Sequence, residues 1–289
     1  MTNSDRQLSV VKTFHKLHES GCFVIPNPFD IGSAVYLHKL GFKALATSSA
    51  GFAFTRGFPD DVNVIGVDVM LDHFREISVA TPLPVNADFQ NGYADEPDAV
   101  AENVKRCLAT GVAGLSIEDR ISGESRQLYD DDMALRRIKA ARRAIDESGM
   151  PVVLTARCEV YLVQHPDPFD FAVRRLTAFA EAGADCLYAP GVTEPKQIEA
   201  IVKAVAPRAV NVLAFRPDPN LSLARLTDIG VRRISVGSAL ARVAWTAFMK
   251  AAQRIAETGE FDLLSENNSF AELNTLFREV RSGGQAGAL

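Results

Sequence analysis

The sequence predicts an α/β protein, a (β/α)8 TIM barrel with an N-terminal helix and additional C-terminal helices. Short apolar runs alternate with amphipathic helical stretches over most of the 289 residues. The apolar runs are continuous, as in parallel strands that are buried on both faces. A doubly wound open sheet is the alternative architecture. Glycine stands between a helical stretch and the next strand at five places, the usual C-cap position: Gly41, Gly111, Gly149, Gly183 and Gly230.

The elements follow one another in a regular order, beginning with a helix over about residues 4–19. After the last strand we expect a helix over about 238–257 and two short helical stretches. We find no linker within residues 20–240, so residues 1–289 should form one domain. Eight strands are expected near 22–26, 43–47, 84–88, 113–117, 151–156, 185–189, 209–213 and 232–236. Helices are expected near 31–40, 66–80, 95–110, 132–148, 169–182, 194–206 and 221–229.

Composition excludes several classes of protein. The formal net charge of -5 gives no basic footprint for nucleic acid. No apolar run is long enough to span a bilayer, and the first residues are polar, unlike a signal peptide. The four cysteines are far apart and form no C-x-x-C pair, which argues against a disulfide framework or structural zinc. We therefore expect a cytoplasmic protein with neither a nucleic-acid nor a membrane partner.

Charged residues gather where the predicted strands end, which is where barrels of this kind carry their active sites. Two aspartates at 60–61 follow the second strand, Asp88 ends the third, Glu118 ends the fourth and Arg157 ends the fifth. Carboxylates that meet at one rim repel one another and raise each other's pKa values. Mg2+ would relieve this repulsion, because it prefers oxygen ligands and needs few from the protein. Ion pairs of Asp88 or Glu118 with Arg157 or Arg120 are the alternative.

The segment Ser49-Ala50-Gly51 follows the second strand and has small side chains with free main-chain N–H groups. It suits an anion such as a carboxylate, although a turn that needs small residues would look the same. The five histidines form no metal-ligand pair and no catalytic triad, and we interpret them as surface or packing residues.

Seven segments resemble, in this order, the isocitrate lyase/phosphoenolpyruvate mutase superfamily: NPFDIGSA, LATSSAGFA, PVNADFQNGY, SIEDR, LTARCE, GADCLYAPG and GVRRISVG. The resemblance extends over about residues 20–245. It implies a (β/α)8 barrel and a homotetramer whose subunits exchange the last barrel helix. It also implies Mg2+, which holds a 2-oxo acid or its enolate.

The resemblance assigns roles residue by residue. Asp88 would be the direct metal ligand, and Asp61 and Glu118 would hold metal-bound waters. The substrate carboxylate would lie against Ser49 and the N–H groups of Ala50 and Gly51. Arg157 would bind the substrate oxygens, and Asn211 would contact the substrate.

This chain also departs from the family pattern. Gln90 stands where many members have a second aspartate, two residues beyond the metal ligand. The segment EDRISGESRQLYDDD lacks the cysteine and lysines of the lyase gating loop, and the mutase's asparagine-bearing loop is not evident. Tyr129, Glu159 or a metal-bound water could replace the missing general acid/base. Arg157, Glu118 and Tyr129 are our candidate catalytic residues, and residues 119–131 should close over a bound substrate.

These observations predict an Mg2+-dependent carbon–carbon lyase that acts on a small 2-oxo or 2-hydroxy carboxylic acid through an enolate. Oxaloacetate-type decarboxylation and retro-aldol cleavage both fit. Carbon–phosphorus chemistry of the phosphoenolpyruvate mutase or phosphonopyruvate type is one alternative. A barrel with a phosphate site after strands seven and eight, and a non-catalytic metabolite-binding barrel, are the others.

The stretch 238–257 has an apolar helical stripe and carries the chain's one tryptophan, Trp245, beside that stripe. A second apolar surface that includes Phe248 and Met249 would need a partner. We expect residues 238–281 to form subunit contacts in a homotetramer built from paired dimers. The alternative is that residues 262–281 fold back and cover this surface within one chain.

Overall fold

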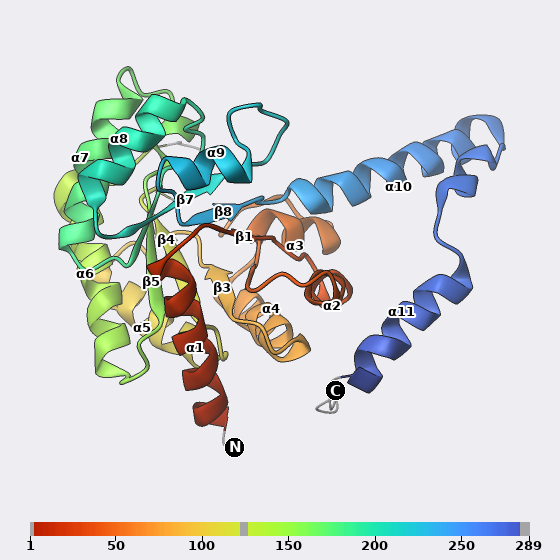
Figure 1. Cartoon of the computed structure of the whole chain (residues 1–289), viewed down its shortest axis with the longest axis horizontal. Helices are drawn as coiled ribbons and strands as arrows, with labels where there is room; N and C mark the ends of the chain where they lie inside the picture. Colours follow the sequence, from red (N-terminus) through yellow and green to blue (C-terminus); the bar gives the residue numbers. More distant parts are fainter. Residues whose placement is uncertain (1–2, 122–126, 284–289) are drawn as a thin grey trace.

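The computed structural model describes residues 3–121 and 127–283, in which eight parallel strands form a nearly closed barrel (Figure 1). The sheet order is β1-β8-β7-β6-β5-β4-β3-β2. The Ala46 N–H donates to the Pro26 carbonyl oxygen at 3.1 Å and so joins the two end strands. The predicted barrel is confirmed. The strands are β1 Phe23–Ile25, β2 Leu45–Ala46, β3 Val85–Asp88, β4 Gly114–Glu118, β5 Val153–Arg157, β6 Cys186–Tyr188, β7 Ala209–Leu213 and β8 Arg233–Ser235.

The helices surround this barrel, and those predicted from periodicity lie within a few residues of their expected places. Two elements were missed, α3 directly after β2 and the 3-10 helix η1 directly after β5. The helices are α1 Asn3–Glu19, α2 Ile31–Lys39, α3 Ser49–Thr55, α4 Val67–Ala80, α5 Pro97–Leu108, α6 Asp131–Glu147, η1 Glu159–Leu162, α7 Pro168–Glu181, α8 Pro195–Val205, α9 Leu223–Asp228, α10 Ala239–Thr258, η2 Asp262–Glu266 and α11 Phe270–Gly283. None of these described helices is both long and apolar enough to cross a membrane.

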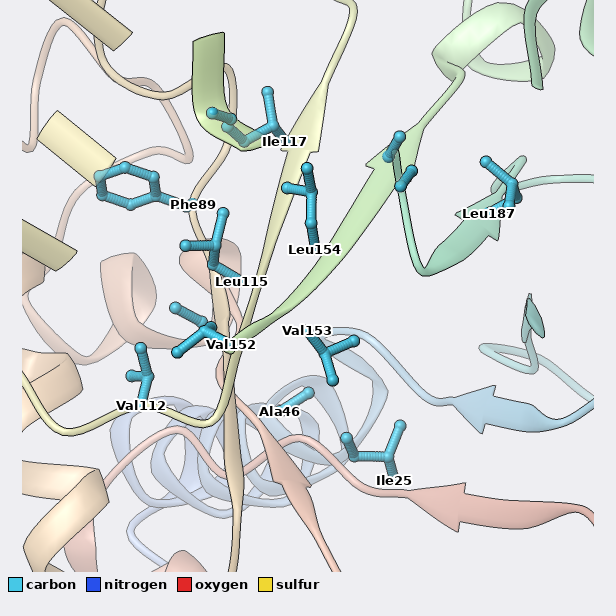
Figure 2. Packing of buried hydrophobic residues seen from close by; sticks show 14 of the residues in the cluster. Ile25, Ala46, Phe89, Val112, Leu115, Ile117, Val152, Val153, Leu154 and Leu187 are labelled. Carbon is cyan, nitrogen blue, oxygen red and sulfur yellow. The ribbon is translucent and has the colours of Figure 1, made fainter. Parts of the chain in front are cut away.

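Alternate residues of the strands face opposite sides of the barrel wall. Leu115 of β4 pairs in register with Leu154 of β5, and both belong to the apolar core, part of which Figure 2 shows. Their neighbours along the strands include Glu118 and Arg157, which line a cavity inside the barrel. The strands therefore hold the helices with one face and present polar side chains inward with the other.

Helix α1 packs against the start of β4, at the end of the barrel where the strands begin. A Cβ atom at Gly114 would come within 2.6 Å of the Phe14 ring, so glycine is needed where α1 approaches the strand. The Gln7 side chain donates to the carbonyl oxygens of Leu108 and Val112, at 2.9 and 3.1 Å. The helix is thus fixed against the β4 side of the wall.

The C-terminal helices leave the barrel. Figure 1 shows α10 extending away from it and α11 returning toward α2. The Phe277 ring lies near Gly32, and Lys39 pairs with Glu279 at 2.7 Å. On α10, Ala241 is buried, whereas Val243 is 67% exposed. Within one chain, η2 and α11 therefore leave the apolar surface of α10 exposed. This differs from the alternative in which residues 262–281 fold back and cover it.

Candidate active site

An open cavity of about 200 Å3 lies inside the barrel at the carboxyl ends of the strands. All eight strands contribute side chains to its lining. A larger groove runs along α10 and η2, but its lining is mainly apolar. Charged groups from several strands converge in the barrel cavity, so we take it as the candidate active site.

Arg157, at the end of β5, is the centre of this site. Its Nη1 lies 2.6 Å from Asp88 Oδ1, and its Nη2 lies 3.1 Å from Glu118 Oε2. Its Nε donates to Glu159 Oε1 at 3.0 Å. The Nε of Arg120 lies 3.7 Å from Glu118 Oε1. The ion pairs that the sequence left as an alternative to metal are therefore present, and they bring together residues from β3, β4 and β5.

Asp88 is held on both of its oxygens. Besides Arg157 on Oδ1, the N–H and the hydroxyl of Ser49 each donate to Oδ2 at 3.0 Å. The Asp88 N–H donates to Thr47 Oγ1 at 2.9 Å. These contacts fix the carboxylate between the ends of β2 and β5, and its role as a metal ligand stays a prediction.

Glu118 and Glu159 are both buried, and their carboxyl groups lie near each other. Glu118 is 7% exposed and Glu159 is 2% exposed. Burial raises the pKa of Glu118 to about 8; Glu159 and Asp88 add repulsion, and Arg157 and Arg120 act in the opposite direction. Burial thus disfavours the charged form of Glu118, although two guanidinium groups contact it. A further cation beside it would favour the charged form.

The structure differs from the prediction at the aspartate pair. Asp60 lines the cavity and accepts a hydrogen bond from Gln90 Nε2 at 3.1 Å. Although much of the residue lies at the surface, loss of water around its carboxyl and the charge of Asp88 raise its pKa. Asp61, the aspartate predicted to hold a metal-bound water, does not line the cavity and accepts from the Asn63 N–H at 2.8 Å. The local turn therefore turns Asp60, not Asp61, toward Asp88.

The predicted carboxylate cradle is the first turn of α3. Ser49 and Ala50 line the cavity, and helical N–H groups in a first turn lack an intrahelical partner. Gly51 does not line the cavity, because the chain has already turned into the helix there. Its N–H donates to the Oγ of Ser48, the N-cap residue, at 3.1 Å. The Gly51 part of the prediction is therefore not supported by the structure.

Tyr129 lies outside the cavity, contrary to its selection as a catalytic residue. Its hydroxyl donates to Asp95 and accepts from Asn91, and the Arg137 guanidinium lies 4.1 Å from its ring centroid. Burial and the hydrogen bond to Asp95 raise its pKa to about 12. With its hydroxyl engaged in this way, Tyr129 fixes the start of α6.

The segment predicted to close over the substrate is held at both ends by Arg175 of α7. This guanidinium contacts Asp119 at 3.0 Å and Asp131 at 2.7 Å. Asp119 also accepts from the Glu159 N–H at 2.8 Å, which connects this clamp to the active site. Residues 122–126, the middle of the predicted closing segment, lie outside the described residues, so the prediction of closure remains untested.

Asn211 lines the cavity as predicted, but its amide contacts two neighbours that the sequence did not single out. Its Oδ1 accepts from Arg233 Nε at 2.9 Å, and its Nδ2 donates to Ser235 Oγ at 2.9 Å. Arg233 and Ser235 also line the cavity. The sequence predicts a strand over residues 232–236. The period of two along a strand would have placed these two on one face.

The carboxylates of this cavity could hold a magnesium ion, although they form no preformed cage. In residues 3–121 and 127–283, no three His, Cys, Asp or Glu side chains converge closely enough to enclose a metal. Asp60, Asp88, Glu118 and Glu159 nevertheless supply hard oxygen donors. Arg120 and Arg157 are the guanidinium groups close to these four carboxylates, and burial first, then the neighbouring carboxylates, raises the pKa values of Asp60 and Glu118. A site that takes few direct ligands and several waters fits these residues.

The family model for phosphoenolpyruvate phosphomutase matches residues 14–256. The chain belongs to this family, within the isocitrate lyase/phosphoenolpyruvate mutase superfamily. Superfamily relatives include carbon–carbon lyases and mutases. The resemblance seen in the motifs is thereby confirmed.

Three relatives illustrate this membership. A structure from Burkholderia cenocepacia J2315, provisionally assigned as a lyase/mutase, is 42% identical with a TM-score of 0.89, over 94% of this chain and 97% of that one. The structure of a 2,3-dimethylmalate lyase is 25% identical with a TM-score of 0.83, over 96% and 99%. An oxaloacetate decarboxylase of Rhodopseudomonas palustris (strain BisB5) is 31% identical over 195 residues, 65% of each chain.

Proposed function

We propose that this superfamily member is an Mg2+-dependent carbon–carbon lyase that cleaves a small 2-oxo or 2-hydroxy carboxylic acid through an enolate. The observation that carries the proposal is the convergence of Asp60, Asp88, Glu118 and Glu159 around Arg157 inside one small cavity. The names of two relatives, a 2,3-dimethylmalate lyase and an oxaloacetate decarboxylase, support carbon–carbon cleavage.

In this proposal Asp88 is the direct metal ligand, and Asp60 and Glu118 hold metal-bound waters. Asp60 replaces Asp61, because Asp60 is the aspartate that lines the cavity. When bound, Mg2+ supplies a Lewis acid that stabilises negative charge on the 2-oxygen of the substrate. The gathering of four carboxylates supports this assignment, since a dication would offset their mutual repulsion.

The chain's own residues bind and orient the substrate. Ser49, whose hydroxyl donates to Asp88, and Ala50 line the cavity, and in this proposal they lie against the substrate carboxylate. Arg157 already holds Asp88 and Glu118, so it can stabilise an oxygen that becomes negative between them. Glu159, buried and lining the cavity, is the remaining protein candidate for taking a substrate proton, because Tyr129 points elsewhere.

A substrate panel tests this function. Purified protein is incubated with 2-oxo and 2-hydroxy mono- and dicarboxylic acids, with Mg2+ or with EDTA, and release of a 2-oxo acid or CO2 is followed. We expect turnover of at least one acid that EDTA abolishes, and loss of that turnover in Arg157→Gln. Turnover of phosphonopyruvate alone would favour carbon–phosphorus chemistry. Binding without turnover of any acid would favour a metabolite-binding barrel.

A further inference from the structure

Arg233 lies in the active-site cavity with neutral partners. It is 3% exposed and lines the cavity. Its Nη2 donates to Thr155 Oγ1 at 3.0 Å, its Nε donates to Asn211, and its Nη1 lies 3.4 Å from His18 Nε2. Burial, with Arg233 as the next cause, lowers the pKa of His18 to about 3, so this ring is neutral. Among the described residues, no carboxylate forms an ion pair with Arg233.

Other buried arginines of the chain are neutralised or bonded differently. Arg157 contacts three carboxylates, and Arg175 contacts two. Arg137, 1% exposed, donates to three main-chain carbonyl oxygens and does not line the cavity. Arg233 therefore combines burial, a place in the cavity lining and a charge that no carboxylate neutralises among the described residues. Burial of an unpaired cation costs free energy that an anionic ligand would offset.

We propose that Arg233 binds a second anionic group of the substrate, a carboxylate remote from the Asp88–Arg157 end. The inference rests on the proposed function and narrows its substrate class to dicarboxylic acids. A planar guanidinium is suited to a carboxylate, because its N–H groups match the two oxygens. Asn211 is then a positioning residue, since its Oδ1 holds the guanidinium through Nε. A cavity of about 200 Å3 limits the substrate to a small acid.

A carboxylate bound by Arg233 also favours one mode of cleavage. In retro-aldol cleavage of a 2-hydroxy acid, the C2–C3 bond breaks and its electron pair passes to C3 and into the carboxylate attached there. The 2-hydroxyl proton goes to Glu159, C2 becomes a 2-oxo carbon, and C3 then takes a proton from water. Negative charge near Arg233 therefore grows in the transition state. Decarboxylation would instead remove this carboxylate as neutral CO2, and Arg233 would hold the ground state more strongly.

Lactate and malate form a matched pair of probes, because both are 2-hydroxy acids and malate adds the second carboxylate. Their binding to the full chain with Mg2+ is measured by calorimetry. We expect the wild-type protein to bind malate about tenfold or more tightly than lactate, as an added charged hydrogen bond would. Arg233→Met should remove this preference and leave lactate binding unchanged. An equal loss of affinity for both acids in Arg233→Met, or an unchanged affinity for malate, would overturn the role of Arg233.

Arg232→Met is the matched control. Arg232 is the preceding residue, does not line the cavity, and donates from Nη1 to the Gly21 carbonyl oxygen at 3.2 Å. Like Arg233→Met, the Arg232→Met substitution removes one positive charge from the chain, but it should keep the preference for malate. If Arg233→Met does not fold, Arg233→Lys serves instead; it should lower the malate preference partly, and an unchanged preference would refute the proposal. Failure of the wild-type protein to bind either acid would reject the proposed function itself.

Discussion

Asp88 and Arg157 are joined at 2.6 Å although β4 separates their strands. The pair spans the cavity mouth because both side chains point inward from strand ends and Glu118 of β4 contacts the same guanidinium. This arrangement makes metal and arginine competitors for carboxylate oxygens. A cation bound by Asp88, as we propose, would share this carboxylate with Arg157 and would oppose the burial and the neighbouring charges that raise the pKa of Glu118.

The aspartate pair gives a matched test of the metal site. Asp60→Asn should weaken Mg2+ binding about 10–100-fold, as loss of a group that holds a metal-bound water does. Asp61→Asn should bind Mg2+ like the wild type, because Asp61 does not line the cavity. Asp88→Ala should bind no Mg2+ detectably and still fold, since a rim residue supports little core packing. Calorimetry with Mg2+ alone measures all three, and equal effects of the two substitutions at 60 and 61 would contradict the assignment.

Substitution of Arg157 should not weaken Mg2+ binding, unlike substitution of Asp60 or Asp88. Arg157→Gln removes the cation that competes for Asp88 and Glu118, so Mg2+ affinity should stay the same or rise. Turnover should fall about 100-fold or more, because the arginine stabilises charge that develops in the transition state. Comparing the Mg2+ titration with kcat separates the two roles. A parallel loss of metal affinity would show that Arg157 acts by organising the metal site.

Acid should destabilise the fold through His73. This side chain is 2% exposed and stacks on Phe52 with ring centroids 4.0 Å apart; burial first, then Arg56, lowers its pKa from 6.5 to about 4. Between pH 6.5 and 4 the unfolded chain binds more protons than the folded chain. The free energy of unfolding is therefore highest above pH 6.5 and falls toward pH 4, by roughly 3 kcal/mol at most from this residue.

His73→Phe keeps the stacking and removes the titrating group. It should flatten this part of the pH dependence while leaving stability near neutral pH about equal or higher, because His73 Nε2 has no hydrogen-bond partner in the described structure. Urea unfolding at several pH values provides the measurement. In this variant His18 should still lower the free energy of unfolding as the pH falls below 6.5, since its pKa is lowered as well. An unchanged slope in the variant would contradict the attribution to His73.

Periodicity and glycine placement were enough to predict the barrel, because each β-α unit repeats the same local signals. Helix α3 was missed for a physical reason: its seven residues, SAGFAFT, are too few to show an amphipathic repeat. Its glycine instead suggested a turn. Ser49 and Ala50 line the cavity, so anion binding by these two residues stays a prediction, while Gly51 belongs to the interior of the helix turn.

The errors within the site come from side-chain direction, which composition does not encode. Asp60 and Asp61 are adjacent and chemically identical, and the backbone turn between Pro59 and Val64 decides which one faces Asp88. Tyr129 is near the site in sequence, but its side chain contacts Arg137 and Asp95 and does not line the cavity. Arg233 could have been found from strand alternation, although its lack of a carboxylate partner depends on the whole fold.

Assembly gives the last prediction, and it concerns the uncovered face of α10. Phe248 is 61% exposed, Met249 is 60% exposed and Trp245 packs edge-on against Phe248 at 5.4 Å between ring centroids. A groove of about 740 Å3 between α10 and η2 adds Val243, Leu263 and other apolar side chains to this surface. An apolar surface of this extent on a projecting helix is typical of a subunit contact. We expect a homotetramer of paired dimers that exchange α10.

Light scattering on the full chain should therefore give four times the chain mass at micromolar concentration. Val243→Glu with Phe248→Glu should dissociate the assembly, because two charges would be buried at the contact. Val79→Glu is the matched control, since Val79 is 58% exposed on α4 and should leave the tetramer intact. Truncation after Arg242 should also give smaller species. A monodisperse monomer for the intact chain would refute the assembly, and dissociation by the control would show that added negative charge alone separates the subunits.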